Sequence, residues 1–373
     1  MRIGIDARLW VWTGVGRYIR NLVLNLQRID NKNEYVIFAR SEDLQNVKSQ
    51  ISNPKWKIVK ADIKWHSLRE QYEFPMILKK ENLDLVHFPY FSIPIFYNKP
   101  FIVTIHDLIM HHFQTGKAST LPLPLYKAKR VGYNKVISHA IRKSKKIIVP
   151  LNAVKDDLIK SLNVPDDKIV VTYEGVDQKI SNSKFLISNA KIKNYSKYFL
   201  YVGNAYPHKN LEGLIGAFRL FKKNNKDNVK LILVGKDDFF YKRLEKNIKD
   251  DSIVFLHDVS DEELRSLYKN STALISASLM EGFGLPTIEA ISNDCLVILS
   301  DIPSFREVCG DSAIYFNPAN PNDIAEKMEE VLKNGRKYYS TQISRARARL
   351  KFFSWEKMAK ETLEVYESSI SLR

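Results

Sequence analysis

Two glutamates that lie eight residues apart, Glu281 and Glu289, flank the part of the chain best suited to chemistry. Two glycines and Pro286 lie between them, and the apolar run 273–277, which predicts a buried parallel strand, comes just before. Proline suits the first turn of a helix because it lacks an N–H. We therefore predict a strand, a glycine turn and a helix whose first backbone N–H groups form an anion site. An anion site between two carboxylates suits a phosphorylated, hydroxyl-rich ligand such as a nucleotide sugar.

Lys209 is the main candidate for a cation at such a site. It follows the apolar strand 199–202 and precedes a helical pattern that begins at Leu211, which predicts a position at the mouth of a sheet. When a sugar leaves a nucleoside diphosphate, negative charge builds on the phosphates, and a donor aimed at it is worth about 3–4 kcal/mol. The alternative for Lys209 is a solvated surface lysine.

His106 and Asp107 end a second apolar strand, residues 101–105. Open α/β sheets bind ligands at the carboxyl ends of their strands, so this pair is a second candidate for the site. The alternative for His106 is a packing or hydrogen-bonding role in the core.

Apolar strands alternate with helical patterns along the whole chain, which predicts an α/β fold with parallel sheets. The predicted strands lie at 2–6, 35–38, 85–88, 101–105, 146–149 and 169–172 in the first half of the chain and at 199–202, 230–234, 253–255, 273–275 and 297–299 in the second. The length of 373 residues suits two domains. We predict two Rossmann-like parallel-sheet domains that face each other across a cleft containing the site. The predicted parts are a first domain, a polar linker, a second domain and a final helix: residues 1–178, 179–196, 197–355 and 356–373.

The spacing of Glu281 and Glu289 resembles the E-x7-E motif of retaining GT-B glycosyltransferases, most closely those of family 4. Further segments resemble the same family in the same order along the chain: 14–18 (GVGRY), 104–108 (TIHDL), 201–210 (YVGNAYPHKN) and 297–316. The form of these segments is most similar to mannosyl- or rhamnosyltransferases of surface polysaccharide assembly.

The resemblance implies that the first domain lies on the acceptor side, that the second binds the donor, and that the helix 356–373 packs back onto the first domain. It also implies a role for each candidate residue. Lys209 contacts the diphosphate, Glu289 binds the ribose hydroxyls, and Glu281 lies near the transferred sugar. His106 contacts that sugar, and Asp107 orients His106 or helps with the acceptor proton, although in such enzymes the leaving phosphate is often the base. Many members carry an arginine where this chain has Asn204 or His208, so a protonated His208 is the candidate second cation. The remaining donor-binding candidates are backbone positions: Gly14, Gly16, Gly282, Phe283, Gly284 and Leu285.

The sequence predicts that no metal or other cofactor takes part. It contains no Asp-x-Asp motif, which holds the divalent metal in the other major transferase fold, and no Cys/His cluster with zinc spacing. A dinucleotide site at Gly14 and Gly16 is disfavoured because Ile19 replaces the third glycine of that motif.

The net charge of +16 is concentrated in the first half of the chain, with +13 in residues 1–184. Residues 127–146 hold eight basic residues and no acid, with a partial apolar face at helical spacing. We predict that this segment lies on an anionic membrane surface; a solvated helix face is the alternative. No nucleic-acid-binding motif accompanies the charge, so we predict no nucleic-acid partner. Two unpaired cysteines, no spanning segment and no signal peptide favour a cytoplasmic protein that is peripheral on the membrane.

These observations together predict a retaining glycosyltransferase that uses a GDP-, UDP- or dTDP-sugar, with GDP-mannose favoured, and a glycan or lipid-linked acceptor. Two alternatives remain. One is a nucleotide-sugar epimerase or hydrolase of the same fold, and the other is a non-catalytic basic scaffold that binds lipid.

Overall fold

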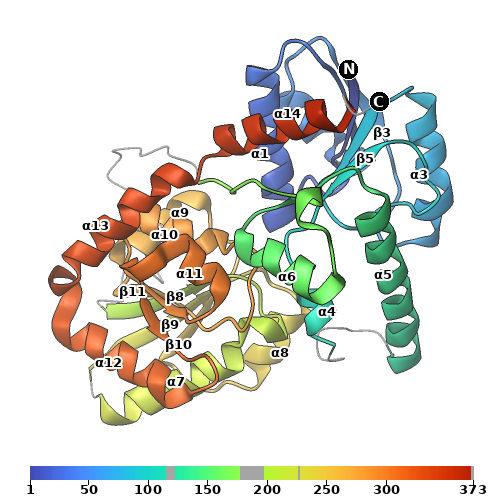
Figure 1. Cartoon of the computed structure of the whole chain (residues 1–373). Coiled ribbons are helices and arrows are strands. Elements are labelled where there is room, and N and C mark those ends of the chain that lie inside the picture. The colour runs from blue at the N-terminus through green and yellow to red at the C-terminus, as the bar shows by residue number, and fades with distance from the viewer. Residues whose placement is uncertain (115–121, 177–196, 226, 371–373) are drawn as a thin grey trace. The chain divides into compact units, whose positions relative to one another are not determined.

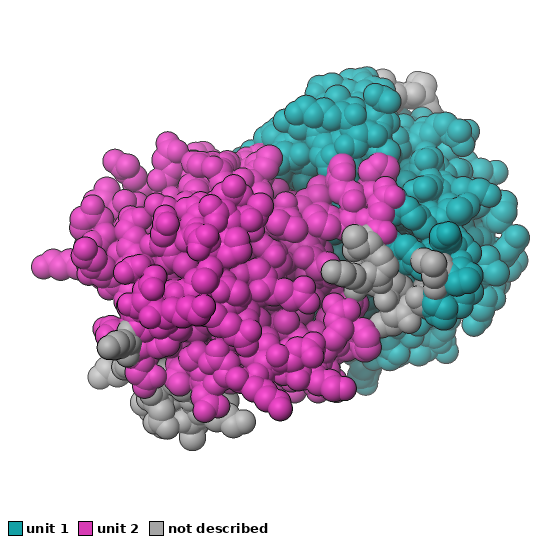
Figure 2. All heavy atoms as spheres, turned by 90° about the horizontal axis from the view of Figure 1, so that it is seen from below, with its two compact units in different colours: residues 1–110, 119–175, 353–373 teal, residues 111–118, 176–352 magenta. Residues whose placement is uncertain are grey.

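The computed structural model describes residues 1–114, 122–176, 197–225 and 227–370 of the chain. The predicted linker 179–196 lies outside these residues. The chain divides into two compact units, residues 1–110, 119–175 and 353–373 in the first and residues 111–118 and 176–352 in the second (Figure 2).

The first unit is built on a seven-stranded parallel sheet with the strand order β3-β2-β1-β4-β5-β6-β7. Its strands are β1 (Arg2–Asp6), β2 (Glu34–Ala39), β3 (Trp56–Lys60), β4 (Leu85–Phe88), β5 (Phe101–Thr104), β6 (Ile147–Val149) and β7 (Ile169–Val171). Its helices are α1 (Gly14–Ile29), α2 (Leu44–Gln50), α3 (Leu68–Lys80), α5 (Leu123–Lys143), α6 (Asn152–Leu162) and the C-terminal α14 (Trp355–Ile370), with the one-turn α4 (Ile109–His112) at the boundary between the units.

The second unit is built on a six-stranded parallel sheet with the order β10-β9-β8-β11-β12-β13. Its strands are β8 (Lys197–Val202), β9 (Val229–Val234), β10 (Ile253–Leu256), β11 (Ala273–Ser276), β12 (Val297–Ser300) and β13 (Ile314–Phe316). Its helices are α7 (Leu211–Asn224), α8 (Phe239–Lys246), α9 (Asp261–Asn270), α10 (Leu285–Ser292), α11 (Pro303–Cys309), α12 (Pro321–Tyr338) and α13 (Ser340–Arg349) (Figure 1).

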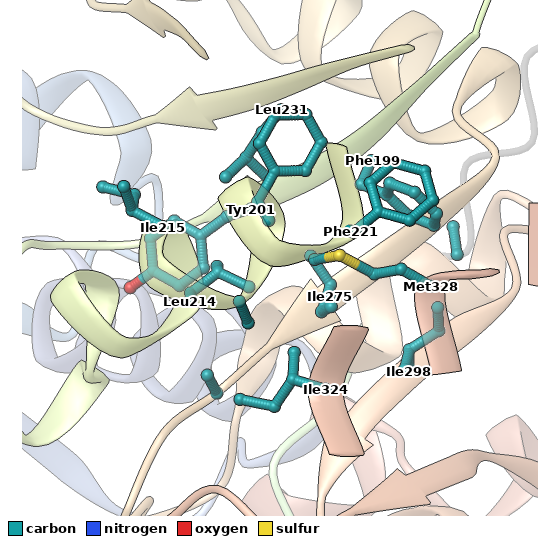
Figure 3. Close-up of a cluster of buried hydrophobic side chains, with 14 of the residues drawn as sticks. Phe199, Tyr201, Leu214, Ile215, Phe221, Leu231, Ile275, Ile298, Ile324 and Met328 are labelled. Atoms are coloured by element: carbon teal, nitrogen blue, oxygen red, sulfur yellow. The ribbon is translucent and has the colours of Figure 1, made fainter. Parts of the chain in front are cut away.

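The core of the second unit lies between its sheet and the helices α7 and α12, which pack side by side (Figure 1). Side chains of β8 and β9, such as Phe199 and Leu231, meet Phe221 of α7 and Met328 of α12 in one buried cluster (Figure 3). Because both faces of a parallel sheet are covered, its strands are nearly continuous apolar runs. This is why β8 to β12 could be located in the sequence.

The last helix, α14, packs against α1 in the first unit (Figure 1). Met358 and Tyr366 are fully buried on its inner face, and Leu363, which the pattern also predicts to face inward, is half-buried. The chain thus returns to the first unit after completing the second.

The α/β fold with two parallel sheets is confirmed. The strands predicted at 2–6, 35–38, 85–88, 101–105 and 146–149 lie within one residue of β1, β2, β4, β5 and β6. The edge strands β3 and β13 were not predicted. β3 has lysines at two of its five positions, and β13 has only three residues, so neither forms a long apolar run.

Candidate active site

The polar candidates of the second unit gather where its strand order reverses. From β8 the chain proceeds outward through β9 to β10, whereas β11 begins the other half of the sheet and pairs directly with β8. Loops after two such strands diverge and leave a crevice at their carboxyl ends, the usual ligand position in open α/β sheets. Lys209 follows β8 and Glu281 follows β11, and the backbone N–H of Leu279 donates to the carbonyl of His208 (2.8 Å), which ties the two loops together.

Lys209 and Glu281 form an ion pair at this edge. The Nζ of Lys209 lies 2.7 and 2.8 Å from the two carboxylate oxygens of Glu281, and both side chains are largely buried, at 15% and 10% exposed. Ser278 donates a further hydrogen bond to Glu281 (2.7 Å), and Ser304 donates to its backbone carbonyl (2.6 Å). The carboxylate therefore keeps the ammonium at this edge of the sheet, where an incoming phosphate would find a cation already in place.

Electrostatics keep Glu281 ionised and His208 neutral. Burial alone would raise the pKa of Glu281, but the charge and hydrogen bonds of Lys209, with help from His208 and Ser278, lower it below its ordinary value. Burial and the neighbouring Lys209 ammonium lower the pKa of His208 to about 4. A neutral imidazole near pH 7 does not supply the second cation that the sequence suggested, so Lys209 is the one cation among the sequence candidates of this unit.

The predicted glycine turn and helix are present. α10 begins at Leu285, Pro286 lies in its first turn, and Gly284 caps it at a φ of +84°. A Cβ at Gly284 would also lie 2.9 Å from the ring of Phe305, so only glycine fits here. Glu289 lies one turn into α10, half-buried, and accepts a hydrogen bond from the hydroxyl of Tyr268 (3.0 Å).

The other loop candidates surround the same pair. Phe283 is buried, whereas Asn204 is half-buried and its carbonyl accepts a hydrogen bond from the hydroxyl of Tyr201 (2.7 Å). The second unit thus brings Asn204, His208 and Lys209 of one loop to Glu281, Gly282, Phe283, Gly284 and Leu285 of the other.

His106 occupies the corresponding edge of the first sheet, just after β5. Its Nδ1 lies 3.1 Å from a carboxylate oxygen of Glu174, and its Nε2 lies 2.9 Å from the carbonyl oxygen of Pro89. The ring of Tyr18 packs edge-on against it at 4.9 Å between centroids. Asp107 accepts a hydrogen bond from the N–H of Ile109 (2.9 Å) and so shapes the turn that follows.

Glu174 is a functional candidate that the sequence analysis missed. It follows β7, and its side chain is 5% exposed. A single glutamate, 68 residues from His106 and outside any recognised spacing, gives no signal that links the two residues. Only the order of β5, β6 and β7 in the sheet could have suggested the contact.

Gly14 and Gly16 lie in the first turn of α1. A Cβ on Gly16 would lie 2.6 Å from the backbone oxygen of Trp10, whereas a Cβ on Gly14 would meet nothing within 4 Å. The close approach of Trp10 therefore requires glycine at position 16, and donor binding by either glycine stays a prediction.

The basic segment 127–146 is also shorter as a helix than predicted. α5 ends at Lys143, so Lys145 and Lys146 lie beyond it. Val131, which we predicted on the apolar face, is 56% exposed, whereas Tyr133, Ile137 and Ala140 are buried as predicted.

Among the residues that the structure describes, no three His, Cys, Asp or Glu side chains are grouped so that they could hold a metal ion. The independence from metals and cofactors stays a prediction. Within the same described ranges, no helix combines the length and the apolar character needed to cross a membrane.

Comparisons with known proteins agree with this geometry. The family described as "Glycosyl transferases group 1" matches residues 182–349, and "Glycosyltransferase Family 4" matches residues 12–179. The chain is 32% identical over 275 residues to the O-antigen chain mannosyltransferase RfbU of Salmonella typhimurium, covering 72% of this chain and 68% of that protein. It is 29% identical over 301 residues to O-antigen chain mannosyltransferase B of Escherichia coli, covering 76% and 74%.

Solved structures share the fold at low identity. Sucrose-phosphate synthase from Thermosynechococcus elongatus superposes with a TM-score of 0.80 at 19% identity, covering 100% of both chains. Anabaena HepE, solved in complex with UDP-glucose, gives a TM-score of 0.76 at 15% identity, covering 99% of this chain and 100% of that one.

Two parallel-sheet α/β domains with this topology define the GT-B class of glycosyltransferases. Within that class, the chain belongs to the family 4 glycosyltransferases, and it is a glycosyltransferase similar to mannosyltransferases.

Proposed function

We propose that this protein transfers a mannosyl group from GDP-mannose, with retention at the anomeric carbon, to a hydroxyl of a glycan or lipid-linked acceptor in surface polysaccharide synthesis. The relatives named as O-antigen mannosyltransferases support the sugar and the pathway. The observation that carries the proposal is the Lys209–Glu281 pair at the reversal of the second sheet.

The proposed chemistry follows from that pair. The bond between the anomeric carbon and the diphosphate oxygen breaks, and a new bond forms to the acceptor oxygen on the same face. The diphosphate leaves with the bonding electrons, the Lys209 ammonium stabilises its charge, and the acceptor proton passes to the leaving phosphate. Glu281 keeps the ammonium aimed while phosphate is absent, and the first N–H groups of α10 add their dipole.

Glu289 is proposed to bind the ribose. Its carboxylate lies one turn into α10 and is oriented by the Tyr268 hydroxyl. A carboxylate accepts hydrogen bonds from two vicinal hydroxyls, which suits a ribose.

A thermal-shift panel of GDP-mannose, UDP-glucose, dTDP-rhamnose and ADP-glucose tests the donor. A donor at 100 times its Kd should stabilise the protein by about 2.7 kcal/mol. We expect the largest shift with GDP-mannose. A larger shift with UDP-glucose would mean that UDP-glucose is the preferred donor, and the proposed binding site would still stand. The panel should include GDP alone, since a shift from GDP equal to that from GDP-mannose means that the sugar adds no affinity.

A hydrolase or epimerase of the same fold is the rival activity. Either would consume GDP-mannose without an acceptor, giving free mannose or a different GDP-sugar. Product analysis with and without acceptor distinguishes these from transfer.

We also propose that the first unit binds an anionic membrane surface. Exposed apolar side chains at successive turns of α3, namely Leu68, Tyr72 and Met76, are 82, 61 and 55% exposed. The ring of Phe96 lies 5.0 Å from that of Tyr72, and its neighbour Ile95 lines a groove of about 510 Å³ with Val131, Lys135 and Arg142 of α5. We call Leu68, Tyr72, Met76 and Phe96, together with the basic helix α5, the amphipathic face.

The charge of the amphipathic face favours lipid over a second copy of the chain. Residues 127–146 carry eight basic side chains and no acid. A two-fold dimer through this face would oppose the same charges on both sides, whereas an anionic bilayer attracts them and accepts the apolar side chains.

Flotation with liposomes of phosphatidylcholine, with and without 30% phosphatidylglycerol, tests the amphipathic face. We expect the wild type to bind only the liposomes that contain anionic lipid, and to bind them more weakly at high salt. The double variant Tyr72→Ser, Phe96→Ser should lose the binding that remains at high salt. Phe239→Ser is the matched control, because Phe239 is 54% exposed in the second unit. Equal binding to both liposomes, or a dimer in light scattering that these serines dissociate, would overturn the membrane proposal.

A further inference from the structure

The His106 ring has an acceptor at each of its nitrogens. A carboxylate oxygen of Glu174 faces Nδ1 at 3.1 Å and the carbonyl oxygen of Pro89 faces Nε2 at 2.9 Å. A carbonyl and an ionised carboxylate can only accept hydrogen bonds. With Glu174 ionised, both contacts are hydrogen bonds only when both ring nitrogens carry a proton, which is the imidazolium form.

His87, close by in the same sheet, shows the opposite arrangement. Its ring nitrogens face the hydroxyls of Tyr366 and Thr104, each at 2.8 Å. A hydroxyl can donate or accept, so a neutral ring satisfies both contacts. Burial and the charge of His106 lower the pKa of His87 to about 3.

Glu174 is held rigidly where it meets His106. It follows β7, and the next residue, Gly175, packs so tightly that a Cβ there would lie 2.2 Å from the backbone nitrogen of Trp355. The start of α14 therefore fixes the backbone beside Glu174. Burial leaves the carboxylate at 5% exposure and the His106 side chain at 12%.

The other groups around His106 are consistent with a positive ring. Asp107 follows it in the chain, Tyr18 packs against it from α1, and neutral His87 lies on β4. Burial alone would lower the pKa of His106, but the hydrogen bond and charge of Glu174, the Pro89 carbonyl and Asp107 outweigh it and raise the pKa above 6.5.

From this geometry we infer that Glu174 is a positioning residue, which fixes the orientation of the His106 ring and keeps both of its nitrogens protonated. His106 then acts as a fixed positive charge at the carboxyl edge of the first sheet and cannot accept the acceptor's proton. The contribution of this charge to transfer rests on the proposed function; the protonation state of the ring does not.

Nitrogen-15 NMR of histidine-labelled protein tests the protonation directly. At pH 7.5 the wild type should show His106, assigned by its loss in His106→Gln, with both nitrogens protonated. In Glu174→Gln the side chain keeps its shape but loses its charge, and its amide N–H₂ can donate to an unprotonated Nδ1, so His106 should become neutral at this pH. A neutral His106 in the wild type, or an unchanged ring in Glu174→Gln, would overturn the inference.

The second unit offers a matched control. His257 also lies between a carboxylate and a carbonyl, 2.7 Å from Glu245 and 2.8 Å from the oxygen of Gly235. Glu245→Gln should change the His257 signals and leave those of His106 as they are, and Glu174→Gln should do the reverse. Changes at both rings in either variant would indicate general unfolding and contradict a local effect.

Kinetics then connect the ring to transfer. A carboxylate that orients a metal-bound histidine typically contributes about 10- to 100-fold to activity. We expect a similar factor here, so Glu174→Gln should lower kcat by roughly that much with the donor KM within about twofold. If the NMR result holds while kcat is unchanged in Glu174→Gln and in His106→Gln, the positioning of the ring stands and its role in the proposed reaction fails.

Discussion

The two units each carry a cation–carboxylate pair at the carboxyl edge of a parallel sheet, but the pairs differ in how firmly the cation is bound. Lys209 has three N–H donors on a flexible stem and is held by a single carboxylate. His106 is a planar ring whose two nitrogens already have acceptors. The lysine can therefore turn toward a phosphate without leaving its partner, whereas the histidine supplies charge and orientation but no free nitrogen.

The largest effect is expected from Lys209→Ala. Removing the ammonium should lower kcat by about 10²–10³-fold, as for the loss of one preorganised donor to a developing anion. The measurement is steady-state transfer from GDP-mannose, with Lys197→Ala as a control. Lys197 also pairs with a carboxylate, that of Asp227, but at 53% exposure. Equal small losses in both variants would mean that the diphosphate is held elsewhere.

Glu289→Ala should weaken nucleotide binding next. Losing hydrogen bonds from a charged acceptor costs about 1.5–3 kcal/mol, so the Kd for GDP measured by calorimetry should rise roughly 10- to 150-fold. Tyr268→Phe removes only the hydroxyl that orients Glu289 and should give a smaller rise. Glu329→Ala, on the exposed face of α12, should leave the Kd as it is; an unchanged Kd in Glu289→Ala removes this residue from the ribose role.

A pair of glycine variants tests how α1 begins in the first unit. Gly16→Ala places a methyl group against the backbone of Trp10 and should lower the free energy of unfolding by about 1–3 kcal/mol. Gly14→Ala meets no neighbour and should be neutral or slightly stabilising, because alanine favours a helix. Chemical denaturation of both variants measures the difference, and equal destabilisation would argue against the close approach at Gly16.

The smallest effect is a difference in pH dependence between the two pairs. The lowered pKa of Glu281 gives stability that is present above about pH 4.5 and is lost as the pH falls through the folded-state pKa. The raised pKa of His106 gives stability that is present below 6.5 and is lost as the pH rises through the folded-state pKa. In a plot of the free energy of unfolding against pH, Glu281→Gln should thus reduce the dependence on the acid side, and His106→Gln should reduce it near neutral pH. The same change in both variants would contradict the pKa shifts assigned to these two residues.

The sequence predicts the candidate site of the second unit better than that of the first unit. Glu281, the glycine turn and Glu289 lie within nine consecutive residues, so local spacing and one helix fix their arrangement. Lys209 is 72 residues from Glu281, yet each follows an apolar strand within a few residues, which predicts the shared edge. Glu174 follows a strand of only three residues, and its contact with His106 depends on the sheet order, which no local pattern encodes.

Surface features were the least predictable. Leu68, Tyr72 and Met76 follow one face of α3 at helical spacing, a pattern that normally indicates a buried stripe. In the structure, Phe74 and Leu78 on another face of α3 are the residues that are buried. The structure is needed to see that the exposed stripe continues toward the basic helix.

The most direct test of the central claim is product analysis after incubation of the protein with GDP-mannose labelled in the sugar and a lipid-linked glycan acceptor. The account predicts mannosylated acceptor and GDP in equal amounts, with an α-linkage to match the α-configured donor, and product formation about 10²–10³-fold slower in Lys209→Ala. Free mannose in place of glycosylated acceptor, or transfer that persists undiminished in Lys209→Ala, would contradict it.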